Sequence, residues 1–411
     1  MTDLTETDYD IIIAGGGMIG TSLGLALAPL RLRVAVVEAV PRSAETQPSF
    51  DDRSTALSRS SQRMFEAMDL WPDIVAASTP IRSIHVSDKG RFGFARIDAE
   101  EQQVEALGYV VINRVLGQVL QQALASVPDL DLICPGRITG VSLRDECATA
   151  TIDEDGAERN LTCRLLVAAD GASSTVRDMI GIGATRVDYD QWAVIGNLLP
   201  ERKPNNQAFE RFTEDGPVAM LPIADDRSAF VWILPPERAK EALALADEQF
   251  VARIQEVFGY RLGRFSRVGK RAAYPLALTK ANGLISRRSV VVGNAAHGLH
   301  PVAAQGFNLG MRDVASLCDC IADTLREGGN IGGASVLEEY SEWRRADHRK
   351  LVHFTDGIVR LFGDSRAPVR VLRDIGMLGF DLVPGVRKAF ARHTMGLAGR
   401  LPRLSRGVPL E

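Results

Sequence analysis

The sequence has few cysteines, and none of them form a CxxC pair. Five occur in 411 residues, namely Cys134, Cys147, Cys163, Cys318 and Cys320. An odd number at these spacings argues against a disulfide framework and against a cysteine-based metal site. We expect Cys318 and Cys320 to be a core and a surface neighbour on one helix, and we expect the protein in a reducing cytoplasm.

Long apolar runs, a signal peptide and a strong net charge are also missing. No run approaches the ~18 apolar residues that a membrane-spanning helix needs, and the acidic start MTDLTETDYD lacks the features of a secretory leader. The net charge of −4 gives no overall attraction to nucleic acid, so no nucleic-acid partner is expected. Hydrophobic residues at 45% and charged residues at 24% are ordinary for a globular chain, and the length suggests two or three domains.

Catalytic histidine patterns are absent as well. The sequence has no recognisable Ser-His-Asp arrangement, and His297 and His300 lie three apart without an acidic ligand nearby. We interpret both as structural residues and expect no metal site. No general base is assigned from the sequence.

What the sequence does contain is a complete nucleotide-binding unit at residues 10–38. A β-branched run, Ile11 to Ile13, predicts a strand buried on both faces. Gly15, Gly17 and Gly20 then supply the GxGxxG spacing where the strand must turn into a helix. We expect them to allow the tight turn, the close approach of a pyrophosphate and the close packing of helix on strand, respectively. The helix N-terminus would face the diphosphate.

A second predicted strand, 34–37, ends at Glu38, which follows Gly20 by 18 residues. A carboxylate there can accept both hydroxyl hydrogens of an adenosine ribose and would repel a 2′-phosphate. The unit therefore favours FAD or NAD over NADP.

The rest of the chain predicts an α/β fold with an insertion. Residues 131–170 alternate as a β-meander that ends in a buried strand and the turn Asp170-Gly171, and 289–297 predicts a third buried strand followed by a helix to about 326. Residues 186–276 carry aromatic, alternating strands and one helix near 237–258. We predict a discontinuous nucleotide-binding domain (1–75, 101–185, 277–345), a substrate domain with an antiparallel sheet (76–100, 186–276) and a C-terminal helical region (346–411).

Three separated blocks together carry a resemblance. They are the GxGxxG with Glu38, the Asp170-Gly171 turn with Arg177, and Gly293-Asn294 followed by the 300–308 loop. Over residues 8–345 the chain resembles the flavoprotein aromatic hydroxylases with a p-hydroxybenzoate-hydroxylase-like fold. Blocks at 50–58, 108–114, 209–217 and 305–313 resemble the ubiquinone-biosynthesis branch, and within it the 2-polyprenyl-6-methoxyphenol hydroxylases.

The resemblance implies the cofactor, the reaction and several site residues. It implies tightly bound FAD, NADPH or NADH as a transient reductant, and O₂ as co-substrate, with a flavin hydroperoxide hydroxylating a polyprenylated phenol. Arg53 and Arg114 would contact FAD, Asp170 and Gly171 would lie near the phosphates, and Asn294 would bind the ribityl chain. Pro301 and Gly306 would position the flavin, and the N–H groups of Gly306, Phe307 and Asn308 would stabilise its reduced form. Asn294 replaces the aspartate usual in the wider family, and Ala304 replaces a common glycine.

Two alternatives to this function stay open. One is a hydroxylase of a soluble aromatic compound, which would need a polar anchor for a carboxylate. The other is a non-catalytic FAD-binding scaffold in a complex with other quinone-biosynthesis proteins, although intact glycines argue against decay of the site.

Charge is strongly asymmetric only in the segment 366–406. It holds nine Lys or Arg against two Asp, interleaved with apolar residues, and Pro384-Gly385 would divide it into two helical pieces. Such a segment suits the surface of an anionic membrane. We expect peripheral contact with the inner face of the cell membrane through 366–406, or else a helical pair packed on the FAD domain.

Overall fold

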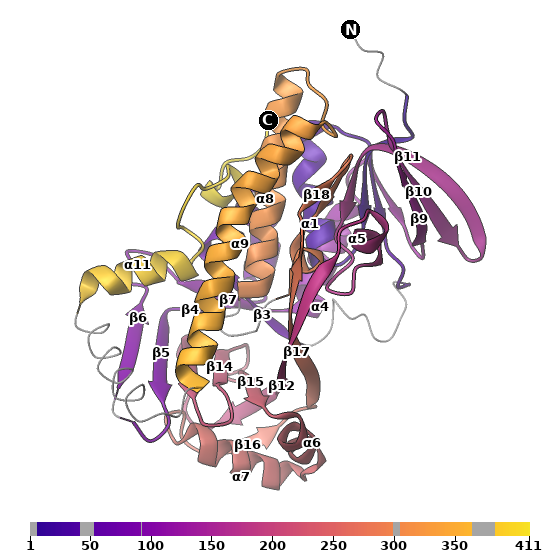
Figure 1. Cartoon of the computed structure of the whole chain (residues 1–411). Coiled ribbons are helices and arrows are strands. Elements are labelled where there is room, and N and C mark those ends of the chain that lie inside the picture. Colours follow the sequence, from indigo (N-terminus) through magenta and orange to yellow (C-terminus); the bar gives the residue numbers. More distant parts are fainter. Residues whose placement is uncertain (1–5, 42–52, 92, 299–304, 364–382) are drawn as a thin grey trace.

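A parallel sheet forms the centre of the nucleotide-binding unit. The computed structural model describes residues 6–41, 53–91, 93–298, 305–363 and 383–411. The strand order is β18-β19-β11-β1-β2-β8, with β18 antiparallel and the others parallel (Figure 1). The strands are β1 (Tyr9–Ala14), β2 (Val34–Val37), β8 (Leu130–Ile133), β11 (Ala157–Ala168), β18 (Ile285–Ser286) and β19 (Ser289–Val291). Ile11, Ile12 and Ile13 are fully buried, as expected for a parallel strand covered on both faces.

The predicted meander is confirmed as an extension of this sheet. β9 (Arg137–Leu143) and β10 (Ala148–Glu154) pair antiparallel with each other, and β10 pairs with the first half of β11. The second half of β11 then pairs in parallel with β1. The long strand β11 therefore links an exposed hairpin to the buried sheet and ends at the Asp170 turn.

Helices cover the central sheet. They are α1 (Met18–Leu27), α4 (Asn113–Leu124), α8 (Gln305–Arg326) and α9 (Ala334–Gly363). α1 contacts both α4 and α8, and α8 contacts α9. A short turn, η1 (Ala28–Leu30), follows α1. The long helices α8 and α9 run side by side (Figure 1). Cys318 and Cys320 are both buried in α8, so the expected surface position is wrong, because this part of α8 is enclosed on all sides. All five cysteines are free thiols.

A small sheet, in the order β3-β7-β4, adjoins the central one. It contains β3 (Ser54–Ser58), β4 (Ser78–Ile81) and β7 (Gly108–Ile112), and the short helices α2 (Arg59–Ala67) and α3 (Trp71–Val75) follow β3. β4 falls inside the segment 76–100 that we predicted for the substrate domain, yet it pairs with β7. The predicted domain limits otherwise stay a prediction.

The second large sheet has the order β20-β17-β12-β15-β14-β13-β5-β6, with β16 beside β12. Its strands are β5 (Ser83–Asp88), β6 (Phe94–Asp98), β12 (Ala184–Pro200), β13 (Gln207–Phe212), β14 (Val218–Pro222), β15 (Ser228–Leu234), β16 (Phe265–Val268), β17 (Ala272–Ala281) and β20 (His297–Gly298). It is antiparallel except that β13 runs parallel to β5, which enters from an earlier part of the chain.

Two helices cover one face of this sheet, where the sequence predicted one. α6 (Pro236–Ala244) and α7 (Asp247–Phe258) are separated because Leu245 and Ala246 adopt extended backbone. The core under them contains Phe209, Phe230, Trp232, Phe250 and Phe258. Phe209 and Trp232 are therefore core residues beneath the two helices, and Trp192 packs against the same core.

The described C-terminal part packs against the rest of the molecule. α11 (Pro384–Thr394) begins at Pro384, so this proline starts a helix; the predicted helical piece before it lies outside the described residues. Beyond α11, the turn η4 (Leu404–Arg406) places Leu404 in the core, together with Leu410. Across the part of the chain described here, no helix has the length and apolarity to cross a bilayer.

Candidate functional site

The glycine turn after β1 leaves no room for side chains. Gly15 has φ +101°, and a Cβ there would come within 2.6 Å of the carbonyl oxygen of Ala169. A Cβ on Gly20 would lie 1.9 Å from the carbonyl oxygen of Gly15. Gly17 is the N-cap of α1 and provides no side-chain cap, so the first N–H groups of the helix stay available for an anion.

A cleft of about 450 Å³ opens directly in front of this turn. It lies at the carboxyl ends of the parallel strands, where open α/β sheets bind ligands. Seven of the predicted cofactor residues line it together: Gly15, Gly17, Glu38, Asp170, Gly171, Asn294 and Phe307. The three separated sequence blocks therefore meet around one cleft.

Glu38 lies at the end of β2 with its carboxylate held by backbone. Its two oxygens accept hydrogen bonds from the N–H groups of Gly16 and Val40, both at 2.7 Å. These donors fix the carboxylate at the rim of the cleft. Each oxygen keeps a further acceptor position, which is what binding a ribose diol requires.

Asp170 follows β11 and organises the opposite wall. Its carboxylate accepts hydrogen bonds from the Ser174 hydroxyl and from the N–H of Val176 at 3.1 Å, at the start of α5 (Thr175–Met179). The buried Arg177 donates to the carbonyl of Ala295 at 3.1 Å and so ties α5 to the short turn η2 (Gly293–Ala295) after β19. The Asp170 and Asn294 turns are thereby held in one arrangement.

Other predicted residues lie outside this lining. Arg53 extends over the ring of Tyr274, with its guanidinium carbon 4.9 Å from the ring centre, and Arg114 is exposed on the first turn of α4. The N–H of Asn113 donates to the carbonyl of Arg53, which brings the two arginine positions close along the backbone. Pro301 lies outside the described residues.

The start of α8 joins this cleft to a second space. Phe307 lines the cleft, whereas Gln305 and Asn308 line an apolar cavity of about 140 Å³ between the small sheet and the second large sheet. The Asn308 side chain accepts from the N–H of Ser58 at 2.8 Å and donates to the carbonyl of Ala56 at 2.9 Å, which fixes α8 to β3. Gly306 lies between Gln305 and Asn308 in the sequence, and a Cβ at this glycine would meet nothing within 4 Å.

Most of the residues in the cavity wall are apolar. One face of the strands β5, β6 and β13 to β15 turns toward it, with Glu210 on β13 as the charged member of the described lining. Burial raises the pKa of Glu210 to about 7. Glu210 belongs to the block 209–217, whose resemblance to the ubiquinone-biosynthesis branch implied no role for this residue.

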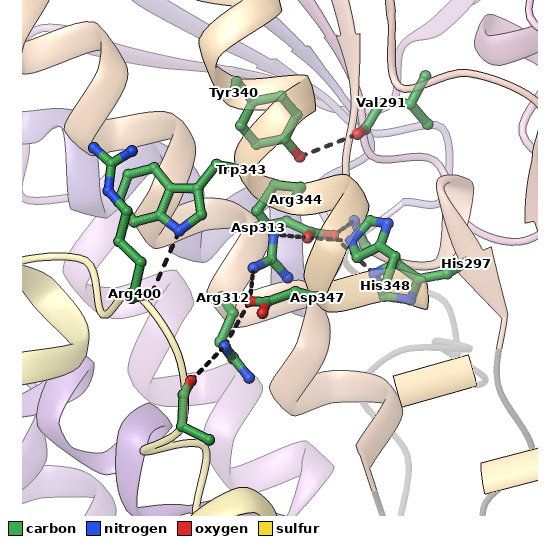
Figure 2. Close-up of polar contacts among 12 residues, drawn as sticks. Val291, His297, Arg312, Asp313, Tyr340, Trp343, Arg344, Asp347, His348 and Arg400 are labelled. Atoms are coloured by element: carbon green, nitrogen blue, oxygen red, sulfur yellow. Dashed lines mark hydrogen bonds and ion pairs between the residues drawn. The ribbon is translucent and has the colours of Figure 1, made fainter. Parts of the chain in front are cut away.

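A buried ion-pair network lies behind the Asn294 turn (Figure 2). Asp313 on α8 accepts from Nε of Arg344 and Nε2 of His348 at one oxygen, both at 2.7 Å. Its other oxygen accepts from Nε2 of His297 at 2.8 Å and from the N–H of Gly293 at 3.0 Å. Asp313 therefore anchors the turn that presents Asn294.

The electrostatics of this network favour an ion pair over a metal site. Burial alone would raise the pKa of Asp313, but His348, Arg344 and His297 together hold it well below its usual range. Burial lowers the pKa of His348, and the nearby Asp313 carboxylate opposes that effect. His297, Asp313 and His348 bring three potential ligand atoms within 4.8 Å of one another. Both oxygens of Asp313 are already engaged, however, and the guanidinium of Arg344 supplies the positive charge.

Sequence reasoning missed Asp313, Arg344 and His348. They lie on helices without a spacing that marks them, and only the packing of α8 on α9 brings them together. His297 was assigned a structural role, and its bond to Asp313 is of that kind.

The cleft fits FAD by its own geometry. A tight turn in which Gly15 and Gly20 have no room for a Cβ, a helix N-terminus and a fixed acceptor carboxylate border a space of about 450 Å³. These are the features that a dinucleotide requires for its pyrophosphate and ribose.

Comparisons with known proteins agree with this geometry. The FAD binding domain family matches residues 8–355. A ubiquinone hydroxylase, UbiL of Rhodospirillum rubrum, is 36% identical over 413 residues, covering 100% of this chain and 95% of that protein. The 3-demethoxyubiquinol 3-hydroxylase of Escherichia coli is 31% identical, covering 96% of this chain and 100% of that protein.

A solved structure gives the fold independently. The p-nitrophenol 4-monooxygenase PnpA of Pseudomonas putida superposes with a TM-score of 0.79 at 18% identity, covering 96% of this chain and 100% of that one. The glycine turn, the shared cleft and these similarities lead to one conclusion: the chain belongs to the FAD binding domain family of flavoproteins.

Proposed function

We propose that this protein is a FAD-dependent monooxygenase that hydroxylates the ring of a polyprenylated phenol in ubiquinone biosynthesis. The names of the relatives support this reaction. The observation that carries the proposal is the start of α8, where residues 305–308 border the cofactor cleft on one side and the apolar cavity on the other. A ring held in the cavity would lie next to the reactive end of the cofactor.

The residues that would hold FAD divide into two groups. Gly15, Gly17 and the N-terminus of α1 would bind the pyrophosphate, and Glu38 would bind the adenosine ribose. Asp170, Gly171, Asn294, Gly306, Phe307 and Asn308 would approach the remainder of the cofactor, with Arg53 and Arg114 as further contacts. When bound, FAD takes electrons from NADPH or NADH and activates O₂ for transfer of one oxygen atom to the ring.

The cavity wall disfavours a soluble substrate that carries a carboxylate. Such a substrate needs a cationic or hydrogen-bonding anchor, and the described lining contains no Lys or Arg. Its charged residue, Glu210, would repel a carboxylate. A prenylated phenol, with one hydroxyl and a large apolar surface, suits this lining better.

We further propose that α11 lies toward the membrane in which the substrate dissolves. Thr394 at the end of α11 lines the apolar cavity, and Lys388 and Arg392 of the same helix are exposed. Exposed cations near an anionic leaflet contribute on the order of 1 kcal/mol each. The helix would therefore bring the cavity close to the lipid surface.

The test begins with the purified protein. It should carry FAD, and a phenol with a short prenyl chain should increase its NADPH oxidation and appear as a product one oxygen heavier in mass spectrometry. The matched non-prenylated phenol serves as the control substrate. Strains blocked at each ring hydroxylation would then identify the position modified. NADPH oxidation that yields only hydrogen peroxide with every phenol would contradict the proposed reaction.

A further inference from the structure

Among the described residues that line the apolar cavity, Glu210 is the one able to take a proton. The strand register places Glu210 of β13 opposite Val86 of β5 and Ala219 of β14, and Ala219 lies opposite Val231 of β15. Residues opposite one another point to the same face of a sheet, so Glu210 lies in a row of aliphatic side chains. The carboxylate faces the cavity and not the helix-covered core.

The described residues give this carboxylate no hydrogen bond and no ion pair. Glu210 is half-buried by its accessible surface. A carboxylate withdrawn from solvent is normally satisfied by such partners, and one without them points to a role beyond stability. The groups opposite Glu210 across the cavity are neutral: Ser58, Gln305, Asn308 and Thr394. An acceptor directed into a largely apolar space would bind a ligand that brings its own donor.

The neighbouring titratable groups lie outside the described cavity lining. Asp88 lies further along the same face, opposite Phe212, outside the described cavity lining. His393, next to Thr394 on α11, interacts with Arg312 and Asp347. Desolvation is the cause of the raised pKa of Glu210, which brings the group near neutral pH, where a general base is most effective.

We propose that Glu210 is the general base that takes the proton from the substrate phenol. This inference rests on the proposed function. A carboxylate oxygen of Glu210 accepts the phenolic hydrogen, the phenolic O–H bond breaks, and its electron pair stays on the phenol oxygen. The ring carbons ortho and para to that oxygen become electron-rich, which is what attack on an electrophilic oxygen requires. After oxygen transfer the hydroxylated ring carbon releases its hydrogen as a proton to water and the ring becomes aromatic again, while the proton on Glu210 returns to the phenol oxygen.

The raised pKa of Glu210 makes proton transfer from the phenol more favourable than transfer to a glutamate with an ordinary pKa. A free phenol has a pKa of about 10, far above that of an exposed carboxylate. A carboxyl with a pKa of about 7 is a considerably stronger base. The aliphatic wall thus determines both which substrate enters and how basic the group beside it is.

The experiment compares two ligands on the FAD-loaded protein. A short-chain prenylated phenol and its methyl ether are titrated between pH 5.5 and 8.5, and binding is followed by the quenching of protein fluorescence. The phenol donates a hydrogen bond to the ionised carboxylate, whereas the ether has no hydrogen to donate. We expect the affinity ratio of phenol to ether to rise about tenfold through pH 7, the scale of one hydrogen bond to a charged group.

Variants identify the group responsible. Glu210→Gln keeps the shape of the side chain and should make the affinity ratio independent of pH, while its product formation falls by about 10²- to 10⁴-fold. Its FAD content and its rate of flavin reduction should stay unchanged. Glu210→Asp should retain part of the pH dependence. The control Glu237→Gln removes an exposed carboxylate of α6 in the same region and should behave as wild type.

The outcomes separate the two proposals. A flat ratio in the wild type, or a ratio in Glu210→Gln that still rises with pH, would overturn the role of Glu210 even if the phenol is hydroxylated. A protein that holds FAD but neither binds nor hydroxylates any prenylated phenol would overturn the proposed function, and the role of Glu210 with it.

Discussion

At the scale of single residues, the backbone of Gly17 predicts an effect on FAD binding, and the environment of Glu210 predicts how stability depends on pH. Gly17 has φ −69° and ψ −176°, an extended conformation that any residue can adopt. Gly17→Val should therefore fold but fill the space in front of α1, and we expect its FAD content to fall to about a tenth or less of wild type. Flavin absorbance after gel filtration measures this. Gly357→Ala is the control, because a Cβ there meets nothing within 4 Å; a Gly17→Val protein with normal flavin content would contradict the assignment of the cleft.

The raised pKa of Glu210 also predicts how stability depends on pH. The folded protein binds the Glu210 proton more tightly than the unfolded chain, so it loses stability as the pH rises from the ordinary value of 4.5 to about 7. Glutamine does not titrate. Glu210→Gln should therefore become more stable than wild type as the pH rises through this range, with a gain on the order of 2 kcal/mol at pH 8. Urea unfolding of both proteins at pH 5 and pH 8 measures the difference, and an equal difference at both pH values would argue against a raised pKa of Glu210.

At the scale of elements, Asp313 connects α8, α9 and the turn before Asn294. Asp313→Asn would leave the fully buried Arg344 without its main counter-charge, and we expect a loss of about 3–5 kcal/mol in the free energy of unfolding. Asp225→Asn, which breaks an exposed pair with Arg227, should cost no more than about 1 kcal/mol. Chemical denaturation compares the two variants. Similar losses would mean that the Asp313 network contributes no more than a surface contact.

The helices and strands also show how much of this fold could be predicted from the sequence. The strand, turn and helix at residues 9–27 follow from local pattern, because a buried strand and a GxGxxG turn have few other solutions. The break between α6 and α7 contains neither glycine nor proline, so no local residue marks it. Glu210 is followed by the charged Arg211 on β13, so the local pattern does not say which of the two side chains faces the interior, and only the small sheet and the helices α8 and α11 opposite make the Glu210 face part of a cavity. The residues of the Asp313 network come from separate helices, and such pairings depend on packing that a single sequence does not contain.

At the scale of the whole molecule, the C-terminal basic residues divide into two groups. Arg403 pairs with Asp319 and Asp323 of α8, and Arg400 lies over Trp343, so these cations hold the C-terminus in place. Removing everything after Gly363 would also remove the buried Leu404 and Leu410, and so would test stability more than lipid binding. The exposed Lys388 and Arg392 of α11 are better targets.

Lys388→Glu with Arg392→Glu should reduce co-sedimentation with anionic vesicles severalfold, because each reversal replaces an attraction on the order of 1 kcal/mol by a repulsion. The control pair, Lys240→Glu with Arg253→Glu, changes two exposed cations on α6 and α7. These helices cover the face of the second large sheet that points away from the apolar cavity. High salt should abolish wild-type binding. Equal sedimentation of both double variants with anionic lipid would show that α11 does not orient the protein on the membrane.

The start of α8 has a thermodynamic consequence. Residues 305–308 form part of the boundary of both the cofactor cleft and the apolar cavity, so a shift of this turn caused by one ligand changes the binding site of the other. Linkage then requires reciprocity: whatever factor FAD contributes to the affinity for the phenol, the phenol must contribute to the affinity for FAD. A cell that supplies the prenylated substrate would in that way also help the enzyme retain its flavin.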